Sequence, residues 1–162
     1  MAFERLFPAF REERILYEAG GLLVVNKPHG VAVHGGDLAL AGDLVTRLKA
    51  RLRARGQDDY LGVHQRLDLG TSGVLAFTRD PKLNPQIAEQ MSEHETERVY
   101  VAIVALATKK SALRDAGVLE QPLETEQGRT RVVKSGGQRA RTRYRVLERV
   151  RERALVELRP ET

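Results

Sequence analysis

The order of apolar and polar residues predicts several short strands near the start of the chain. Apolar residues at 15–17 and 22–25 flank the turn-forming segment Ala19-Gly20-Gly21, which is typical of two strands joined as a hairpin. Proline and glycine in the segment 26–30 (Asn-Lys-Pro-His-Gly) predict a turn directly after the second strand. Residues 31–34 (Val-Ala-Val-His) indicate another short strand.

A helix follows, because one face of the next segment is apolar at helical spacing. Gly56 marks its expected end, since glycine favours the backbone conformation that terminates helices. Cations are interleaved with the apolar stripe, and most of them are expected to form a solvated helix face. The stripe consists of Leu40, Leu44, Leu48 and Leu52, and the cations are Arg47, Lys49, Arg51, Arg53 and Arg55.

The middle of the chain predicts a buried strand, a helix and a further strand. Residues 74–77 form a short, dense apolar run that suits a buried strand. A helix is expected to start at Asp80-Pro81 or at Asn84-Pro85, because the first helical turn accepts proline. Residues 98–106 are rich in valine and isoleucine and predict a strand. The residues of the helix that are expected to face the core are Ile87, Ala88 and Met91.

The last third of the chain predicts loops followed by a hairpin. Residues 107–138 are polar, contain several glycines and show little periodicity, so they indicate loops with short strands. Alternation over residues 139–158 predicts a hairpin, and the period of two places a row of arginines on one strand face. Such a row requires either a polyanion or interspersed acids, and the sequence leaves both open. The arginines are Arg139, Arg141, Arg143 and Arg145.

The composition is that of a folded globular chain with excess positive charge. Its 162 residues, of which 41% are hydrophobic and 30% charged, fit a single domain spanning 1–162. Lys and Arg number 27 against 22 Asp and Glu, and the net charge of +5 favours polyanions, including nucleic acid and anionic membranes. The chain has no cysteine, which excludes disulfides and thiolate metal sites. No apolar run approaches the roughly 20 residues that span a bilayer, and no signal peptide pattern is present, so we expect a cytoplasmic protein.

One acid, Asp68, is the strongest candidate for chemistry. It lies in the segment 64–73 (His-Gln-Arg-Leu-Asp-Leu-Gly-Thr-Ser-Gly), two residues after Arg66 and just before a Thr-Ser-Gly turn. A carboxylate that is held in a tight loop beside a cation is a candidate for catalysis. Asp, Gly, Thr and Ser are also common turn residues for local hydrogen-bonding reasons. The spacing alone therefore favours a capped turn with a structural role.

Several other chemistries are not supported by the sequence. The histidines lack the spacing of a metal site and have no cysteine partners. Residues 70–73 are not a nucleophile elbow, because position 74 is valine instead of glycine. No phosphate-binding or dinucleotide-binding glycine loop occurs, and no second carboxylate pairs with Asp68 for hydrolysis. The histidines are His29, His34, His64 and His94.

Spaced motifs along the chain resemble those of the RluA-type pseudouridine synthases. Arg66-Leu67-Asp68-x-x-Thr71-Ser72-Gly73 resembles the family's R-L-D-x-x-T-S-G signature. Residues 15–30 resemble its opening strand pair and K-P-x-G turn, residues 98–102 its K-x-Y-x-A strand, and residues 140–147 its A-x-T-x-Y strand. Because these matches occur in the family's order over nearly the whole chain, the chain is identified as a member.

The resemblance implies a fold, a set of site residues and a partner. The fold is α+β, with a mixed, largely antiparallel sheet and flanking helices around a central cleft. Asp68 is implied to be the catalytic aspartate, Tyr100 to pack against the target base, and Arg66 to help open the RNA helix and hold the displaced nucleotide. The family uses neither a metal nor an organic cofactor, and the partner is ribosomal or transfer RNA. Further RNA contacts are expected from Thr71, Ser72, Arg139, Arg141 and Arg143.

The chain departs from the family pattern at three points. Gln65 stands where the family has a histidine, with His64 one position earlier, and Arg98 replaces a lysine. The sequence ends at Thr162, where the family continues with a P-x-T-G-R-x-H-Q segment whose basic residue pairs with the aspartate. The family's S4-type RNA-binding module is also not found. We therefore expect a catalytic domain without the C-terminal segment, in which Asp68 relies on Arg66 or another local cation.

Three functions follow from this reading. The first is an enzyme that flips a uridine out of RNA and exchanges its C1′–N1 bond for a C1′–C5 bond, with Asp68 attacking C1′ or removing a proton at C2′. The second is a catalytically impaired remnant of the same family that binds RNA. The third is an assembly domain that self-associates through an open sheet edge, which leaves Asp68, Tyr100 and the arginines unexplained.

Overall fold

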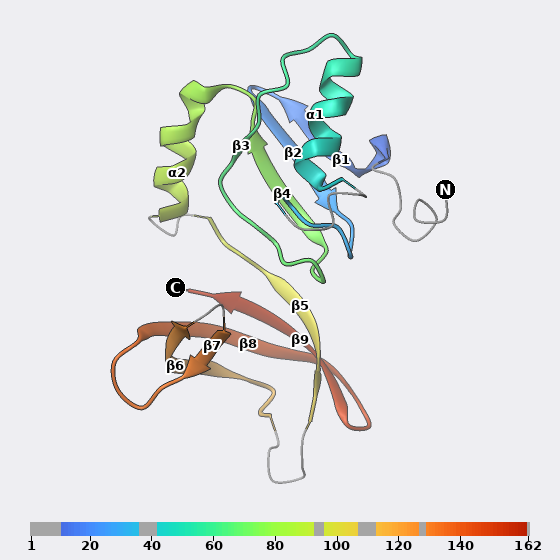
Figure 1. The fold of residues 1–162 in the computed structure, drawn as a ribbon. Coiled ribbons are helices and arrows are strands. Elements are labelled where there is room, and N and C mark those ends of the chain that lie inside the picture. The colour runs from blue at the N-terminus through green and yellow to red at the C-terminus, as the bar shows by residue number, and fades with distance from the viewer. Residues whose placement is uncertain (1–10, 36–41, 93–95, 107–112, 127–128, 162) are drawn as a thin grey trace. The chain divides into compact units, whose positions relative to one another are not determined.

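The computed structural model describes residues 11–35, 42–92, 96–106, 113–126 and 129–161. The chain forms two compact units, residues 1–92 and 93–162. Each unit contains one sheet, and the two α-helices of the described residues belong to the first unit (Figure 1). The expected α+β class is confirmed, with every described strand pair antiparallel and the strands divided between two sheets. The prediction of a single catalytic domain over 1–162 stays a prediction.

The sheet of the first unit has the strand order β1-β2-β4-β3. Its strands are β1 (Ile15–Ala19), β2 (Leu22–Lys27), β3 (Gly62–Val63) and β4 (Gly73–Thr78). The hairpin that the sequence predicted is the antiparallel pair β1 and β2. Strand β2 also pairs with β4 along its whole length, from Leu22 opposite Thr78 to Lys27 opposite Gly73. The chain therefore leaves β2 and enters β4 at the same end of the sheet.

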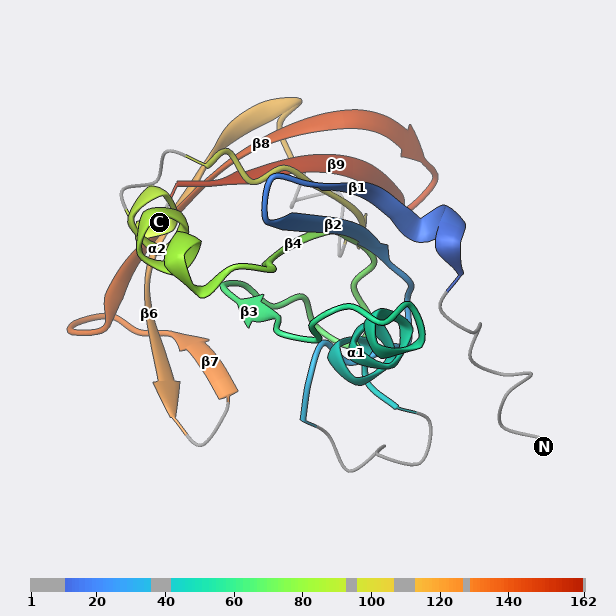
Figure 2. The same ribbon diagram turned by 90° about the horizontal axis from the view of Figure 1, so that it is seen from above.

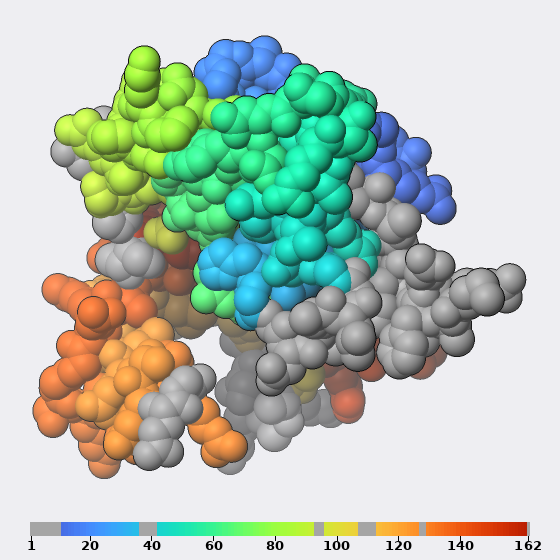
Figure 3. Space-filling view, turned by 45° about the horizontal axis from the view of Figure 1, so that its top comes forward, coloured from blue at the N-terminus to red at the C-terminus, as the bar shows by residue number. Residues whose placement is uncertain are grey.

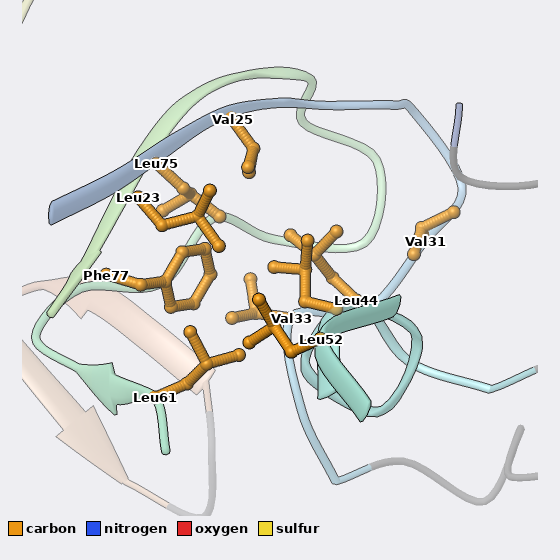
Figure 4. Close-up of a cluster of buried hydrophobic side chains, with 10 residues drawn as sticks. Leu23, Val25, Val31, Val33, Leu44, Leu52, Leu61, Leu75 and Phe77 are labelled. Carbon is orange, nitrogen blue, oxygen red and sulfur yellow. The ribbon is translucent and has the colours of Figure 1, made fainter. Parts of the chain in front are cut away.

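Helix α1 (Leu44–Ala54) covers one face of this sheet (Figure 2). It begins at Asp43, whose side chain accepts a hydrogen bond of 2.7 Å from the Thr46 amide and satisfies one free N–H of the first turn. The predicted leucine stripe is buried at 44, 48 and 52, whereas Leu40 lies outside the described residues. These leucines form the core of the unit (Figure 4) together with Leu23, Val25, Val31, Val33, Leu61, Leu75 and Phe77.

The segment 31–34 is not the strand that its alternation predicted. Val31 and Val33 are buried as an alternating strand would require, but the segment belongs to no sheet. Its backbone carbonyls instead accept hydrogen bonds from the start of α1: Leu44 N–H donates to Ala32 O at 2.9 Å and Val45 N–H to Val33 O at 3.1 Å. The free amides of a helix N-terminus thus replace a neighbouring strand as partners.

The predicted buried strand at 74–77 is β4, and only one of its faces is buried. Leu75 and Phe77 are almost fully buried, whereas Val74 is 61% exposed. A helix covers one face of this antiparallel sheet, so alternate residues of β4 stay in contact with solvent.

Both proline signals after β4 mark starts of helical structure. Pro81–Leu83 form the 3-10 turn η3, and α2 (Asn84–Ser92) follows directly. Helix α2 lies on the surface of the first unit (Figure 3) and buries none of its residues. The prediction that Ala88 faces the core is therefore wrong, while Ile87 and Met91 are half-buried. No helix in the described part of the chain has the length and apolarity to span a membrane.

The second unit is a sheet with the strand order β5-β9-β8-β6-β7. The predicted strand at 98–106 and hairpin at 139–158 are confirmed as β5 and as the pair β8 and β9. The expectation of loops with only short strands at 107–138 is wrong, because an 11-residue strand pairs with the arginine-bearing strand there. The strands are β5 (Tyr100–Ala105), β6 (Ala116–Glu126), β7 (Arg129–Val132), β8 (Gln138–Val150) and β9 (Arg153–Pro160).

Arg51 differs from the solvated cations that were expected along α1. Its side chain is only 9% exposed and joins the helix to two earlier acids. The guanidinium donates to Glu12 at 2.8 Å and to Glu18, on β1, at 2.8 and 3.1 Å. Hydrogen bonds to Arg51 are the main reason that the pKa values of the Glu12 and Glu18 carboxyls lie below their ordinary value.

We expect Arg51→Met to lower the free energy of unfolding by about 2 kcal/mol, because it removes several charge-assisted hydrogen bonds. The lowered carboxyl pKa values also predict a pH dependence: this stabilisation is complete above the unfolded pKa near 4.5 and is lost as the pH falls through the folded values. Urea unfolding of both proteins at pH 7 and through the acid range measures each effect.

Arg53→Met is the matched control, because Arg53 lies on the same helix, pairs with Asp59 and is 67% exposed. Exposed pairs contribute little, so this variant should keep both the stability and its acid dependence. Equal effects of the two substitutions would show that Arg51 is not a structural anchor.

Candidate active-site loop

Two loops meet at the end of the first sheet where β2 ends and β4 begins. The 27–30 turn leaves β2, and the loop that contains Asp68 enters β4. The Gly30 amide donates to Leu69 O at 2.8 Å, and His29 Nδ1 hydrogen-bonds to Gly70 O at 2.8 Å across 41 residues of sequence. Backbone and side-chain bonds thus tie the two loops together.

The loop is also held from within, and it presents Asp68 to solvent. Leu67 packs against the core, while the next residue, Asp68, is exposed. The Thr71 amide donates to Asp68 O at 3.0 Å and closes a tight turn. Gly73 then enters β4 with a φ of 139°, a value that favours glycine. The Asp68 carboxylate therefore projects from a braced loop.

Lys27 is a functional candidate that the sequence reasoning missed. It was read only as part of the K-P-x-G turn, yet its side chain is fully buried. The ammonium donates to Val31 O at 2.7 Å and to Pro28 O at 3.2 Å. Burial lowers the pKa of Lys27, and the charge of Asp68 partly opposes this effect. A signal was present, because Lys27 has the same strand parity as Leu23 and Val25, which face the core.

His64 anchors the start of the loop through a partly buried series of hydrogen bonds. Its Nε2 lies 3.0 Å from Thr78 Oγ1, Thr78 donates to Asn84 Oδ1 at 2.5 Å, and Asn84 donates to the Tyr60 hydroxyl at 2.5 Å. The Thr78 hydroxyl has one hydrogen, which it donates to Asn84. It must therefore accept the hydrogen bond from His64, which assigns the ring hydrogen to Nε2. The family has a histidine at position 65, where this chain has glutamine. The hydrogen bond to Thr78 gives His64, one position earlier, a structural role.

The other predicted residues of this loop surround Asp68 in sequence. Arg66 and Ser72 are exposed, and Thr71 is half-buried. Among the described residues, no ion pair joins Arg66 to Asp68, so Arg66 does not serve as its direct counter-ion here. The RNA contacts expected of Arg66, Thr71 and Ser72 stay predictions.

Tyr100 and the arginine strand belong to the second unit. Tyr100 is half-buried at the start of β5, opposite Leu158 of β9. Asp68 belongs to the first unit, so neither unit alone brings these two predicted residues together. The role of Tyr100 against the target base stays a prediction.

The arginines of β8 lie beside glutamates, which answers the question that their spacing raised. The register places Arg141 opposite Glu120 of β6 and Arg145 opposite Glu157 of β9. Interspersed acids therefore offset the repulsion along this face. The ion pairs are Arg139–Glu120, Arg141–Glu120, Arg141–Glu161, Arg143–Glu161 and Arg145–Glu157.

The site offers one exposed carboxylate on a fixed loop, and the neighbouring turn that is hydrogen-bonded to this loop follows a buried lysine, Lys27. Such a carboxylate can act as a nucleophile or as a general base, because both roles need an ionised, oriented oxygen. No group of three or more histidine, aspartate or glutamate side chains in the described residues could hold a metal ion.

Comparison with known proteins finds similarity over nearly the whole chain. A family model described as RNA pseudouridylate synthase matches residues 21–162. The ribosomal large subunit pseudouridine synthase D of Xylella fastidiosa is 35% identical over 149 residues, which cover 91% of this chain and 44% of that protein. The ribosomal large subunit pseudouridine synthase C of Vibrio parahaemolyticus is 30% identical over 152 residues, or 93% and 46% of the two chains. The chain thus spans less than half the length of these curated relatives.

Solved structures show the same similarity. Human RNA pseudouridylate synthase domain containing 4 superposes with a TM-score of 0.72 at 27% sequence identity, covering 93% of this chain and 59% of that one. Human RNA pseudouridylate synthase domain containing 1 has a TM-score of 0.71 at 20% identity, with 91% and 59% covered, and supports the fold alone.

Proposed function

The chain belongs to the RluA-type RNA pseudouridylate synthase family, and on that premise we propose that it isomerises uridine to pseudouridine in structured RNA. The observation that carries the proposal is the Asp68 loop, which combines the family's R-L-D-x-x-T-S-G motif with an exposed, braced carboxylate. Ribosomal RNA is the first substrate to test, because that is what the similar synthases are named for, and transfer RNA is the second.

The reaction needs one carboxylate and no external reagent. The C1′–N1 bond of uridine breaks, a C1′–C5 bond forms, C5 loses its hydrogen as a proton, and N1 gains one. The product is therefore an isomer of the substrate. Since the uracil is both the leaving group and the incoming nucleophile, no second carboxylate is required to activate water. Asp68 can form a bond to C1′ or take a proton from C2′, and both routes need its ionised form.

The target base must leave the RNA helix and stay near the ribose while it turns. Flipping costs unstacking energy, which contacts to the displaced nucleotide offset. We assign these contacts to Arg66, Thr71 and Ser72, which share the loop with Asp68. Tyr100 is proposed to pack against the base, because an aromatic face beside the reacting groups excludes water.

Release of tritium from RNA labelled at C5 of uridine tests the proposal directly, because forming the C1′–C5 bond expels that hydrogen. We expect the wild-type chain to release tritium from ribosomal or transfer RNA. A chain that binds RNA but releases none would be an RNA-binding remnant of the family. A chain that does neither would leave assembly through a sheet edge as the remaining hypothesis.

The paired arginines of β8 can still contact phosphates. Exposed ion pairs contribute little to stability, so phosphate can replace glutamate beside Arg139 and Arg143 at small cost. Each lost contact between an arginine and a phosphate makes the slope of log affinity against log salt less steep by about 0.7 to 0.9. We therefore expect Arg139→Gln and Arg143→Gln each to reduce the slope by about that amount, measured by filter binding at several salt concentrations.

Arg131→Gln is the control for this experiment. Arg131 is also an exposed arginine of the second unit, paired with Glu124 and Glu126 on the neighbouring strand β6. It should leave the slope unchanged. If the double variant of Arg139 and Arg143 also keeps the wild-type slope, these arginines pair with their glutamates and do not contact phosphate.

A further inference from the structure

The burial of Lys27 needs an explanation, because a charged ammonium is costly to remove from water. Lys27 occupies the core-facing parity of β2, where an apolar side chain would ordinarily lie. It is the one buried lysine among the described residues. A neutral donor, such as a backbone amide or a hydroxyl, could bond the same two carbonyls at a lower desolvation cost. Capping of the turn alone therefore does not explain why a charged side chain is buried here.

The neighbouring strand carries a glycine opposite Lys27. Lys27 is paired with Gly73 of β4, and directly paired residues of antiparallel strands place their side chains on the same face. Gly73 has no side chain, so β4 carries none opposite Lys27, and the nearest atom to a Cβ at that position would be Leu67 Cδ1 at 3.8 Å. The same glycine is the last residue of the R-L-D-x-x-T-S-G motif. The two motifs are thus matched across the strand pair.

The hydrogen bonds of Lys27 leave part of its donor capacity free. An ammonium has three N–H groups, and the described acceptors are Pro28 O and Val31 O. No described carboxylate forms a direct ion pair with Lys27. Among the described residues, Asp68 is the charged group whose field acts on it. The other charged or titratable groups of these two loops are His29, His64 and Arg66; His29 is hydrogen-bonded to Gly70 O and His64 to the Thr78 hydroxyl.

We infer that Lys27 is the buried counter-charge of Asp68 and positions the loop that presents it. Lys27 fixes the 27–30 turn through Pro28 O and Val31 O, and that turn holds the Asp68 loop through Gly30 and His29. The ammonium also places a positive charge in the interior of the unit whose loop presents Asp68, and charge acts more strongly in that interior than in water. Lys27 is a positioning residue, since it acts through Asp68, and its catalytic meaning rests on the proposed function.

A titration of Lys27 tests this inference without any use of activity. Its pKa is followed by NMR of labelled lysine side chains in the wild-type chain, in Asp68→Asn and in Glu89→Gln. Loss of the Asp68 charge removes the effect that opposes burial, so the pKa of Lys27 should fall further in Asp68→Asn. Glu89→Gln removes an exposed charge of α2 in the same unit and should leave it unchanged. Identical titrations in all three proteins would overturn the inference.

The second arm measures turnover in Lys27→Met, which removes the charge and keeps a similar length. Loss of positioning should lower kcat roughly tenfold to a hundredfold, with the KM for RNA changed less than about threefold, because the Lys27 side chain is fully buried. A fall in RNA affinity with unchanged kcat would contradict the inference. If this variant does not fold, the titration in Asp68→Asn still decides. If the wild-type chain is inactive, the proposed function fails while the titration arm stands.

Discussion

Asp68→Asn is expected to lower tritium release from C5-labelled RNA by at least roughly a thousandfold, the range of a lost general base or nucleophile. Asparagine has nearly the same shape but is neither basic nor nucleophilic. The fold should survive, because the side chain is exposed and its backbone carbonyl still accepts the Thr71 amide. RNA affinity should hold or rise slightly, since a negative charge is removed from the surface that is proposed to meet phosphate.

Asp58→Asn is a matched control in the same unit. Asp58 is an exposed loop aspartate whose Oδ1 accepts from the Tyr60 amide at 2.8 Å, and asparagine can keep that bond. The control should retain wild-type turnover. Substantial tritium release by Asp68→Asn, with the fold shown intact by circular dichroism, would remove Asp68 from the reaction.

The second large effect concerns stability, and we expect Gly62→Ala to lower the free energy of unfolding by about 3 kcal/mol. A Cβ at position 62 would lie 2.1 Å from Thr78 Oγ1 and 2.7 Å from Asn84 Oδ1. Thr78 is fully buried and both atoms belong to the hydrogen-bond chain that starts at His64. Either these hydrogen bonds must break or β3 must move, and either change leaves buried polar groups without partners. Urea unfolding measures the loss.

Gly70→Ala is the control, because neither glycine has a positive φ and the two positions differ in available space. The nearest atom to a Cβ at Gly70 is His29 Cε1 at 3.9 Å, an ordinary contact. This variant should change stability by less than about 0.5 kcal/mol. A Gly62→Ala protein as stable as the wild type would show that the network has room to adjust.

The two experiments separate the chemistry of the loop from its support. Asp68→Asn changes a solvent-facing atom and leaves the hydrogen bonds that anchor the loop, from Gly30, His29 and Thr71, in place. Gly62→Ala changes the buried support and leaves the carboxylate intact. Loss of activity in both, with loss of stability in only the second, is the pattern expected if a reactive group is mounted on a rigid base.

The local elements of the fold follow from the sequence alone. The hairpin of β1 and β2, the leucine stripe of α1 and the hairpin of β8 and β9 are confirmed, because each depends on side-chain period and on turn residues within one segment. The order of motifs along the chain identified the family, which the match over residues 21–162 confirms. Asp68 was selected in the same way, and its exposure on a braced loop agrees with a chemical role.

The errors arose where a segment's partners are distant in sequence. Residues 31–34 alternate like a strand, but their carbonyls accept hydrogen bonds from the first amides of α1 and not from a neighbouring strand. Strand β6 lacks an apolar period because its glutamates pair with arginines of both neighbouring strands, β8 and β7, instead of entering a core. Ala88 lies beside Ile87 on a helix and was predicted to face the core with it, yet α2 buries no residue and Ala88 is exposed.

By itself, then, the sequence determined the family, the local elements and the candidate catalytic acid, Asp68, because these depend on residue type and spacing along one stretch of chain. Only the tertiary structure decided that Lys27 is buried, that the turn at 27–30 holds the Asp68 loop, and that the arginine row is paired with acids. Burial, counter-charge and hydrogen-bond partners are properties of neighbours in space, and the chain folds those neighbours together from positions some 40 residues apart.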